Sequence, residues 1–100
     1  MEKHVAISAL AALAQETRLD IFRLLVRAGR EGVTAGTLAD ALAVPSATLS
    51  FHLKELRSAG VAHCRREGRE RIYSPNFDAM NELLRFLTEN CCGGVASGDV

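Results

Sequence analysis

The stretch TAGTLADALAVPSATLSFHLKELRSAG, residues 34–60, holds two short helical patterns separated by a break at residues 43–45. The first pattern places Leu38 and Leu42 on one side of a helix. The second repeats leucine at helical spacing, as one stripe made of Leu49, Leu53 and Leu56. Two such helices joined by a tight turn are typical of a helix-turn-helix, in which the second helix lies in a groove of DNA.

The face of the second helix that lies opposite the leucine stripe carries small, polar and basic residues. Small side chains let the helix backbone approach the floor of the major groove, and hydroxyl groups contact base edges or phosphates. A lysine on this face is well placed to contact phosphate. We therefore predict DNA contacts from Ala47, Thr48, Ser50, Phe51 and Lys54.

Two ring-bearing side chains of this helix have more than one interpretation. Phe51 either meets thymine methyl groups in the groove or packs beneath the segment that follows the helix. His52 lies between the inward and outward faces, where it either contacts a phosphate or serves as a structural histidine. Periodicity alone does not separate these alternatives.

Two further helices are expected before this motif. Residues 5–14 are rich in alanine, which suits close helix packing in the core or between subunits, on a face formed by Ile7, Leu10, Ala11 and Ala14. Residues 15–17 interrupt the helix, and a second one follows over residues 18–27 until Gly29, a residue suited to a left-handed helix cap. Thr34 is the expected N-cap of the next helix, because its hydroxyl can accept from a free backbone N–H.

The segment after the motif, VAHCRREGRERIY at residues 61–73, predicts two short strands around Gly68. A two-stranded hairpin is only marginally stable by itself, so it must pack against the helices, as the wing of a winged helix does. We predict that the wing contacts phosphates or the minor groove through Arg66, Arg69 and Arg71. The alternative is an ordinary solvated hairpin. A last helix is expected over residues 76–91, with an apolar stripe of Met80, Leu83, Leu84 and Leu87.

Composition indicates one small domain that would gain from dimerisation, because the chain has 100 residues and 48% of them are hydrophobic. The formal net charge is zero, yet residues 45–73 hold six basic side chains against three acidic ones. Positive charge is thus concentrated where a phosphate backbone would be met. No segment resembles a signal peptide or a membrane span, so a cytoplasmic protein with no membrane partner is expected.

The cysteines are the most reactive feature of the sequence. Three are present, an odd number, and Cys91 and Cys92 are adjacent, which favours free thiols over a disulfide framework. Thiolates select soft ions, and trivalent arsenic takes three sulfur ligands as arsenite or two as a monomethylated arsenical. We therefore predict that Cys91 and Cys92 bind such an ion. Cys64 is either a third ligand or a small buried residue of the wing.

Taken together, residues 10–25 (LAALAQETRLDIFRLL), the helix-turn-helix and the RREGRERIY of the wing resemble the ArsR/SmtB family of winged helix-turn-helix repressors. The resemblance implies a mainly α fold with a small β-hairpin, in a homodimer formed by the first and last helices. It also implies a repressor whose affinity for double-stranded operator DNA falls when an inducer binds. The expected domain is residues 1–92, followed by a flexible tail over residues 93–100.

Comparison with this family also narrows the inducer. Some arsenic-responsive members carry a Cys-x-Cys in the helix before the recognition helix, and here Ala39 and Ala41 stand at those places. Zinc-responsive members use Asp and His along the last helix, where this chain has Asp78 and no histidine. The chain resembles members that sense arsenicals through a C-terminal cysteine pair. The resemblance implies a trivalent arsenic or antimony species as inducer, with no cofactor needed for folding.

Three other functions compete with this one. In a redox-responsive repressor the cysteine pair would oxidise, and since a disulfide between neighbours is strained, the bond would have to cross between subunits. A winged helix used only for protein contacts is the second alternative. A thiol enzyme is the third, and it is disfavoured because the chain has no Cys-x-x-Cys and no nucleotide cradle. The chain is not expected to be an enzyme.

Overall fold

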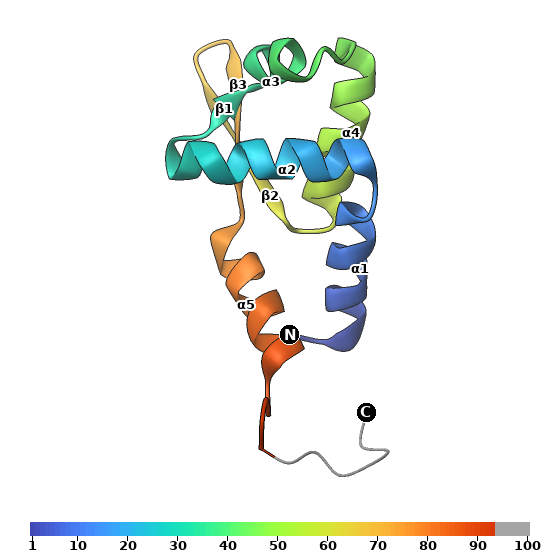
Figure 1. Ribbon diagram of the computed structural model, residues 1–100. Coiled ribbons are helices and arrows are strands. Elements are labelled where there is room, and N and C mark those ends of the chain that lie inside the picture. The colour runs from blue at the N-terminus through green and yellow to red at the C-terminus, as the bar shows by residue number, and fades with distance from the viewer. Residues whose placement is uncertain (94–100) are drawn as a thin grey trace.

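The computed structural model describes residues 1–93 and shows a mainly helical domain with a small antiparallel sheet (Figure 1). The fold predicted from the sequence is confirmed. A 3-10 turn at Gly29–Glu31 follows the second helix. The elements run in the order α1 (Lys3–Leu13), α2 (Glu16–Ala28), β1 (Val33–Thr34), α3 (Ala35–Leu42), α4 (Ser46–Ser58), β2 (Ala62–Glu67), β3 (Glu70–Pro75) and α5 (Phe77–Thr88).

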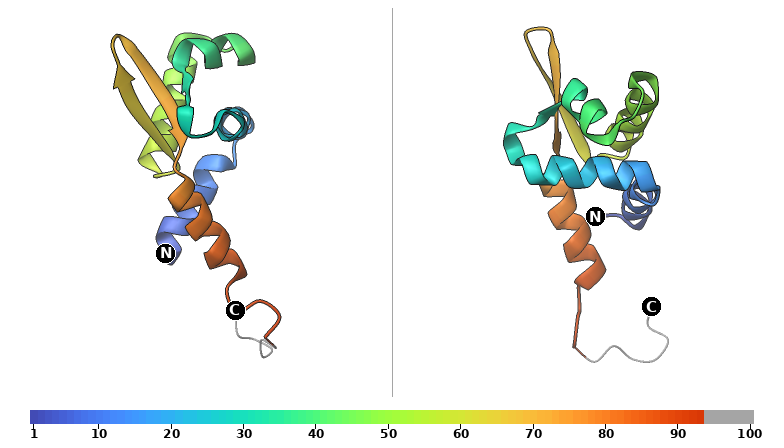
Figure 2. Two further views of the ribbon diagram at one scale, coloured as in Figure 1. Left: turned by 90° about the vertical axis from the view of Figure 1, so that its left-hand side faces the viewer. Right: turned by 45° about the horizontal axis from the view of Figure 1, so that its top comes forward.

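Helix α2 crosses the middle of the molecule and divides it into two ends (Figures 1 and 2). Helices α3 and α4 and the tip of the β2–β3 hairpin form one end. Helices α1 and α5 contact each other and extend toward the other end, which also holds the segment after α5. This arrangement separates the helix-turn-helix from the cysteine pair.

Polar side chains cap the helices where the sequence changes from one element to the next. The Gln15 side chain accepts from the Arg18 backbone N–H at 2.8 Å, which starts α2 after the expected break. The Thr34 hydroxyl accepts from the Thr37 backbone N–H at 3.2 Å, as predicted. Each cap satisfies a backbone donor that the first helical turn leaves free.

The sheet has the strand order β1-β3-β2, and its hairpin is the predicted wing. Its two-residue turn contains Gly68 at a φ of 64°, as a tight hairpin requires. The short strand β1 was not predicted, and it pairs with β3 through Val33 opposite Tyr73 and Thr34 opposite Ile72. The wing is therefore the outer part of a three-stranded sheet, and β1 attaches it to the helices.

The core confirms the leucine stripe of α4, and it excludes the predicted face of α1 from the core of one chain. The largest fully buried side chains are Ile21, Leu25, Leu38, Leu49, Leu53 and Leu56. In α1 the buried residues are Ala6, Ala9 and Ala12. Ile7 and Leu10 are 58% and 41% exposed. Alanines face the core because they allow α1 to approach its neighbours closely, so the larger residues point outward.

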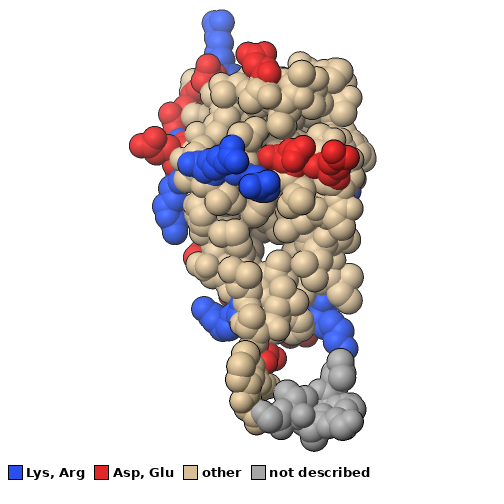
Figure 3. Space-filling model, in the orientation of Figure 1, with Lys and Arg blue, Asp and Glu red and all other residues tan. Residues whose placement is uncertain are grey.

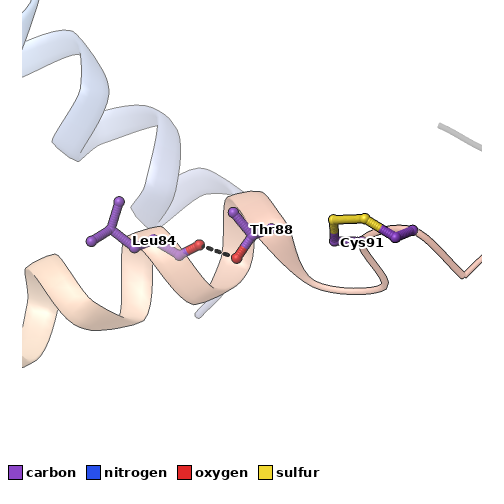
Figure 4. The surroundings of a disulfide bond; sticks show 4 residues. Leu84, Thr88 and Cys91 are labelled. Atoms are coloured by element: carbon purple, nitrogen blue, oxygen red, sulfur yellow. Dashed lines mark hydrogen bonds between the residues drawn. A yellow bond between two sulfur atoms is a disulfide. The ribbon is translucent and has the colours of Figure 1, made fainter.

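Helix α5 is shorter than predicted, because it ends at Thr88 and not at residue 91. The Thr88 hydroxyl donates to the Leu84 carbonyl at 2.7 Å (Figure 4), and Glu89 is already extended. Of the predicted stripe, Leu83 is buried and Met80 is half-buried, whereas Leu84 and Leu87 are 55% and 54% exposed. The predicted tail lies outside the described residues, except for Gly93. Within residues 1–93 no helix has the length and apolar character needed to cross a bilayer.

Candidate DNA-binding surface and cysteine pair

Helix α4 presents a continuous exposed face, which we call the α4 face. The four buried side chains of α4 are Leu49, His52, Leu53 and Leu56, and they hold the helix against the rest of the domain. The α4 face consists of the five α4 residues that were predicted to contact DNA, and all five are exposed: Ala47, Thr48, Ser50, Phe51 and Lys54. The structure thus leaves their side chains available to a ligand.

The two ring-bearing residues of α4 differ sharply in burial. Phe51 is 55% exposed, so the interpretation that it packs beneath the wing is wrong. His52 is 8% exposed, and its Nδ1 lies 3.4 Å from Nη1 of Arg18, which confirms the structural interpretation. The two rings meet edge to face with centroids 5.5 Å apart. Phe51 therefore belongs to the α4 face, and His52 supports it from below.

The wing arginines divide into one that is held by the protein and three that project. Arg65 pairs with Glu67 at 2.6 Å and donates to the backbone carbonyl of Glu31 at 2.6 Å, which fixes the wing to the turn after α2. The other three are exposed and make no ion pair with any residue in the range 1–93: Arg66, Arg69 and Arg71. Exposed guanidinium groups of this kind are well suited to bind an anion.

A groove between α4 and β2 adds basic groups that the sequence analysis did not single out. It is lined by Lys54, Arg57, Ser58, Ala62, His63 and Cys64. Arg57 and His63 are both exposed. His63 alternates with the half-buried Cys64 along β2, so the alternation of the strand was the signal that could have revealed it. The groove extends the positive surface from α4 toward the wing.

Cys64 is a free thiol and packs against the core as a half-buried residue of β2. Its partner across the hairpin is the buried Tyr73. Burial raises the pKa of the Tyr73 hydroxyl, and the neighbouring Cys64 raises this pKa further. Within residues 1–93 of one protomer, no three His, Cys, Asp or Glu side chains form a group suited to a metal ion. The structure therefore does not bring Cys64 together with Cys91 and Cys92 in such a group.

The cysteine pair lies in the exposed turn that follows α5. Its two sulfur atoms lie next to each other in one chain and are drawn as a disulfide (Figure 4). Asn90 and Cys92 have left-handed backbone conformations, with φ of 61° and 65°. Both residues lie in the turn after α5, where the two sulfur atoms are close enough to bind one common ligand.

Large apolar side chains are exposed on α1 and α5. Val5 is 39% exposed, and on α5 Leu84 and Leu87 are more than half exposed, as Ile7 and Leu10 are on α1. Figure 3 shows few charged side chains over α1 and α5, in the lower half of the view, whereas acidic and basic groups cluster along α2. Exposed apolar residues that gather in this way mark a surface for protein contact.

Comparison with known proteins identifies the class of protein. A family described as a helix-turn-helix domain matches residues 13–65. An uncharacterized HTH-type transcriptional regulator of Methanocaldococcus jannaschii is 33% identical over 90 residues, which cover 89% of this chain and 99% of the relative. Regulators of this kind bind DNA and are not enzymes.

Solved structures of similar regulators share the whole fold. An ArsR-like transcriptional regulator from Rhodococcus sp. RHA1 is 32% identical with a TM-score of 0.74, over 84% of this chain and 76% of that one. A possible transcriptional regulator for arsenical resistance is 28% identical with a TM-score of 0.70, over 80% of each chain. A homodimeric winged helix-turn-helix domain of a possible ArsR-family regulator from Mycobacterium bovis is 26% identical with a TM-score of 0.69, over 85% and 77%. This chain belongs to the ArsR family of winged helix-turn-helix transcriptional regulators.

Proposed function

We propose that this regulator is a repressor that acts in the cytoplasm by binding operator DNA through the α4 face and the wing. The support is the exposure of all five predicted residues of the α4 face, and of Arg66, Arg69 and Arg71 in the wing. Small and hydroxyl-bearing residues of α4 would read base edges, while the wing arginines and Lys54 would hold phosphates. A winged helix used only for protein contacts remains the alternative if no specific duplex is bound.

We further propose that the repressor is a homodimer formed by α1 and α5. The exposed apolar residues of both helices support it, because their burial against a second copy would remove them from water: Val5, Ile7, Leu10, Leu84 and Leu87. The similar domain from Mycobacterium bovis is homodimeric. A dimer would also present two α4 helices to the two halves of a symmetric operator.

The double substitution Leu84→Glu and Leu87→Glu tests the dimer. Burying two carboxylates without partners is costly, so we expect the dimer to dissociate at least about 100-fold more readily. Analytical ultracentrifugation measures this at micromolar concentrations. Arg85→Glu is the matched control, because it changes the charge of α5 by the same two units at an exposed polar position. Dimers of unchanged stability in the double variant would contradict the proposed interface.

The inducer that the cysteine pair fits best is a trivalent arsenical or antimonial. The observation that carries this proposal is that one chain brings the Sγ atoms of Cys91 and Cys92 together in an exposed turn. When both are reduced, two thiols can bind a monomethylated arsenic(III) dihydroxide, forming two As–S bonds and releasing two waters. The arsenic is not oxidised or reduced in this step. Soft sulfur ligands favour such ions over magnesium or calcium.

The double substitution Cys91→Ser and Cys92→Ser tests the inducer. Protein reduced beforehand is bound to a duplex selected from a random library and is then titrated with methylarsenite, arsenite, antimonite and zinc. We expect the arsenicals or antimonite to release the wild-type protein and the Cys64→Ser control, and to leave the double variant bound. Release of the double variant at the same concentrations would overturn the assignment of the pair as sensor.

Oxidation of the pair is a second candidate signal, because the sulfur atoms of Cys91 and Cys92 lie next to each other. Two thiols would give two electrons and two protons to one molecule of hydrogen peroxide, yielding the disulfide and two waters. DNA release by peroxide, with no response to arsenicals, would support this candidate. A disulfide within one chain also predicts a protein of monomer mass on a non-reducing gel, whereas a bond between subunits predicts a dimer.

A further inference from the structure

One arginine joins three helices at the centre of the molecule. Arg18 lies in the first turn of α2 and is half-buried. Its Nε donates to the backbone carbonyl of Ala12 in the last turn of α1 at 2.7 Å. Its Nη1 lies 3.4 Å from Nδ1 of His52, near the middle of α4. A single side chain thus connects a helix with an exposed apolar face to the helix with the exposed DNA-binding residues.

The chemistry of this contact fixes the direction of the hydrogen bond. A guanidinium group has donors only, so in this contact Arg18 donates and Nδ1 of His52 accepts. His52 is 8% exposed and holds Phe51 edge to face at 5.5 Å. The contacts therefore run without a gap from α1 through Arg18 and His52 to an exposed residue of the α4 face.

Apolar packing does not close the space between α1 and α4 on this side. A groove remains there, lined by Ser8, Ala11, Ala12, Arg18, Glu55, Ser58 and Ala59. Its lining residues are small apart from Arg18 and Glu55, so they do not fill the space between the two helices. Arg18 lines this groove, and its contacts with Ala12 of α1 and His52 of α4 connect the two helices beside it.

We propose that Arg18 and His52 are positioning residues that set the orientation of α4 relative to α1, and hence the spacing of the two α4 helices in the dimer. This inference rests on the proposed dimeric DNA-binding function. Two recognition helices must meet half-sites about 34 Å apart, so a small rotation of each α4 places the second helix out of register. Neither residue needs to contact DNA for its loss to weaken binding.

The test compares variants that keep or remove the acceptor at residue 52. In His52→Asn the amide oxygen can take the place of Nδ1, whereas His52→Leu fills similar space with no acceptor. On a duplex selected by the wild-type protein, we expect His52→Asn to bind within about threefold of wild type. We expect His52→Leu and Arg18→Gln each to bind at least about tenfold more weakly, because a misoriented α4 loses contacts with bases in both half-sites.

Two further readouts separate positioning from a general structural role. The wild-type protein should lose affinity when one base pair is inserted between the half-sites, and His52→Leu and Arg18→Gln should lose that discrimination. Spin labels at Lys3 of α1 and Arg57 of α4, in a chain whose three cysteines are serines, should show a broader distance distribution in both variants. The distance measurement needs no DNA and remains informative if binding is lost.

Three outcomes would overturn the inference. One is a His52→Leu protein that binds DNA as tightly as wild type and keeps its spacing preference. Another is equal loss in His52→Asn and His52→Leu, since the acceptor would then not matter. The third is an additive effect in the double variant Arg18→Gln, His52→Leu, because residues that act through one contact are not additive. If the wild-type protein selects no duplex at all, the proposed function fails, and the distance distributions alone then test whether Arg18 and His52 orient α4.

Discussion

Gly32→Ala is expected to lower the free energy of unfolding by about 3 kcal/mol or more, because it combines backbone strain with overpacking. Gly32 has a φ of 85°, a conformation that residues with a Cβ rarely adopt. A Cβ at this position would lie 2.6 Å from Cγ2 of Ile72 and 2.8 Å from the backbone oxygen of Tyr73. The second contact is with backbone and cannot be relieved by a rotamer change. Urea denaturation followed by circular dichroism measures the loss.

Gly36→Ala is the matched control for this experiment. Gly36 lies in α3, and a Cβ there would meet nothing within 4 Å. Alanine is a better helix former than glycine, so this variant should be more stable than wild type by about 0.5 to 1 kcal/mol. Equal stability of the two variants would show that the strand β1 and its entry at Gly32 do not hold the wing to the domain.

Replacing Arg66, Arg69 and Arg71 together by alanine is expected to weaken operator binding by roughly 100-fold or more at physiological salt. A dimer would lose up to six phosphate contacts, so the slope of the logarithm of the binding constant against the logarithm of salt concentration should fall by up to about 5. Fluorescence anisotropy at several salt concentrations measures both quantities. The three side chains are exposed, so the stability of the fold should change little.

The control is Arg23→Ala, Arg27→Ala and Arg85→Ala, which removes the same charge from exposed positions on α2 and α5. Its salt dependence should stay close to that of the wild-type protein. Equal effects of the two triple variants would mean that net charge, and not the wing, governs binding. Arg65 is left unchanged in both, because its contacts with Glu67 and Glu31 support the wing itself.

The sequence predicted those parts of the fold that depend on local pattern. The stripe of Leu49, Leu53 and Leu56 is buried as expected, because helical spacing alone puts these residues on one side. The cap at Thr34 and the turn at Gly68 also follow from the chemistry of single residues. For the same reason, the exposed residues of the α4 face could be named in advance.

The sequence did not predict features that depend on contacts between distant segments. The strand β1 is two residues long, and only its pairing with Tyr73 and Ile72 makes it a strand. The role of Arg18 depends on where α1 ends relative to α4, which no periodicity reveals. The sequence did not show which side of α1 packs into the core. Ala6, Ala9 and Ala12 do so, whereas Ile7 and Leu10 of the predicted face are exposed in one chain.

Because α5 ends at Thr88, the residues that follow it can diverge in sequence more freely than the rest of the domain. No residue after Thr88 in the described chain belongs to the hydrophobic core, and residues 89–93 are all exposed. Substitutions at exposed positions away from the core usually alter stability by less than about 0.5 kcal/mol. Side chains in this short turn can therefore be replaced with little effect on folding. If the turn binds the inducer as proposed, its ligand groups can change without altering the α4 face. A lineage could acquire a new signal while it keeps the same set of genes under control.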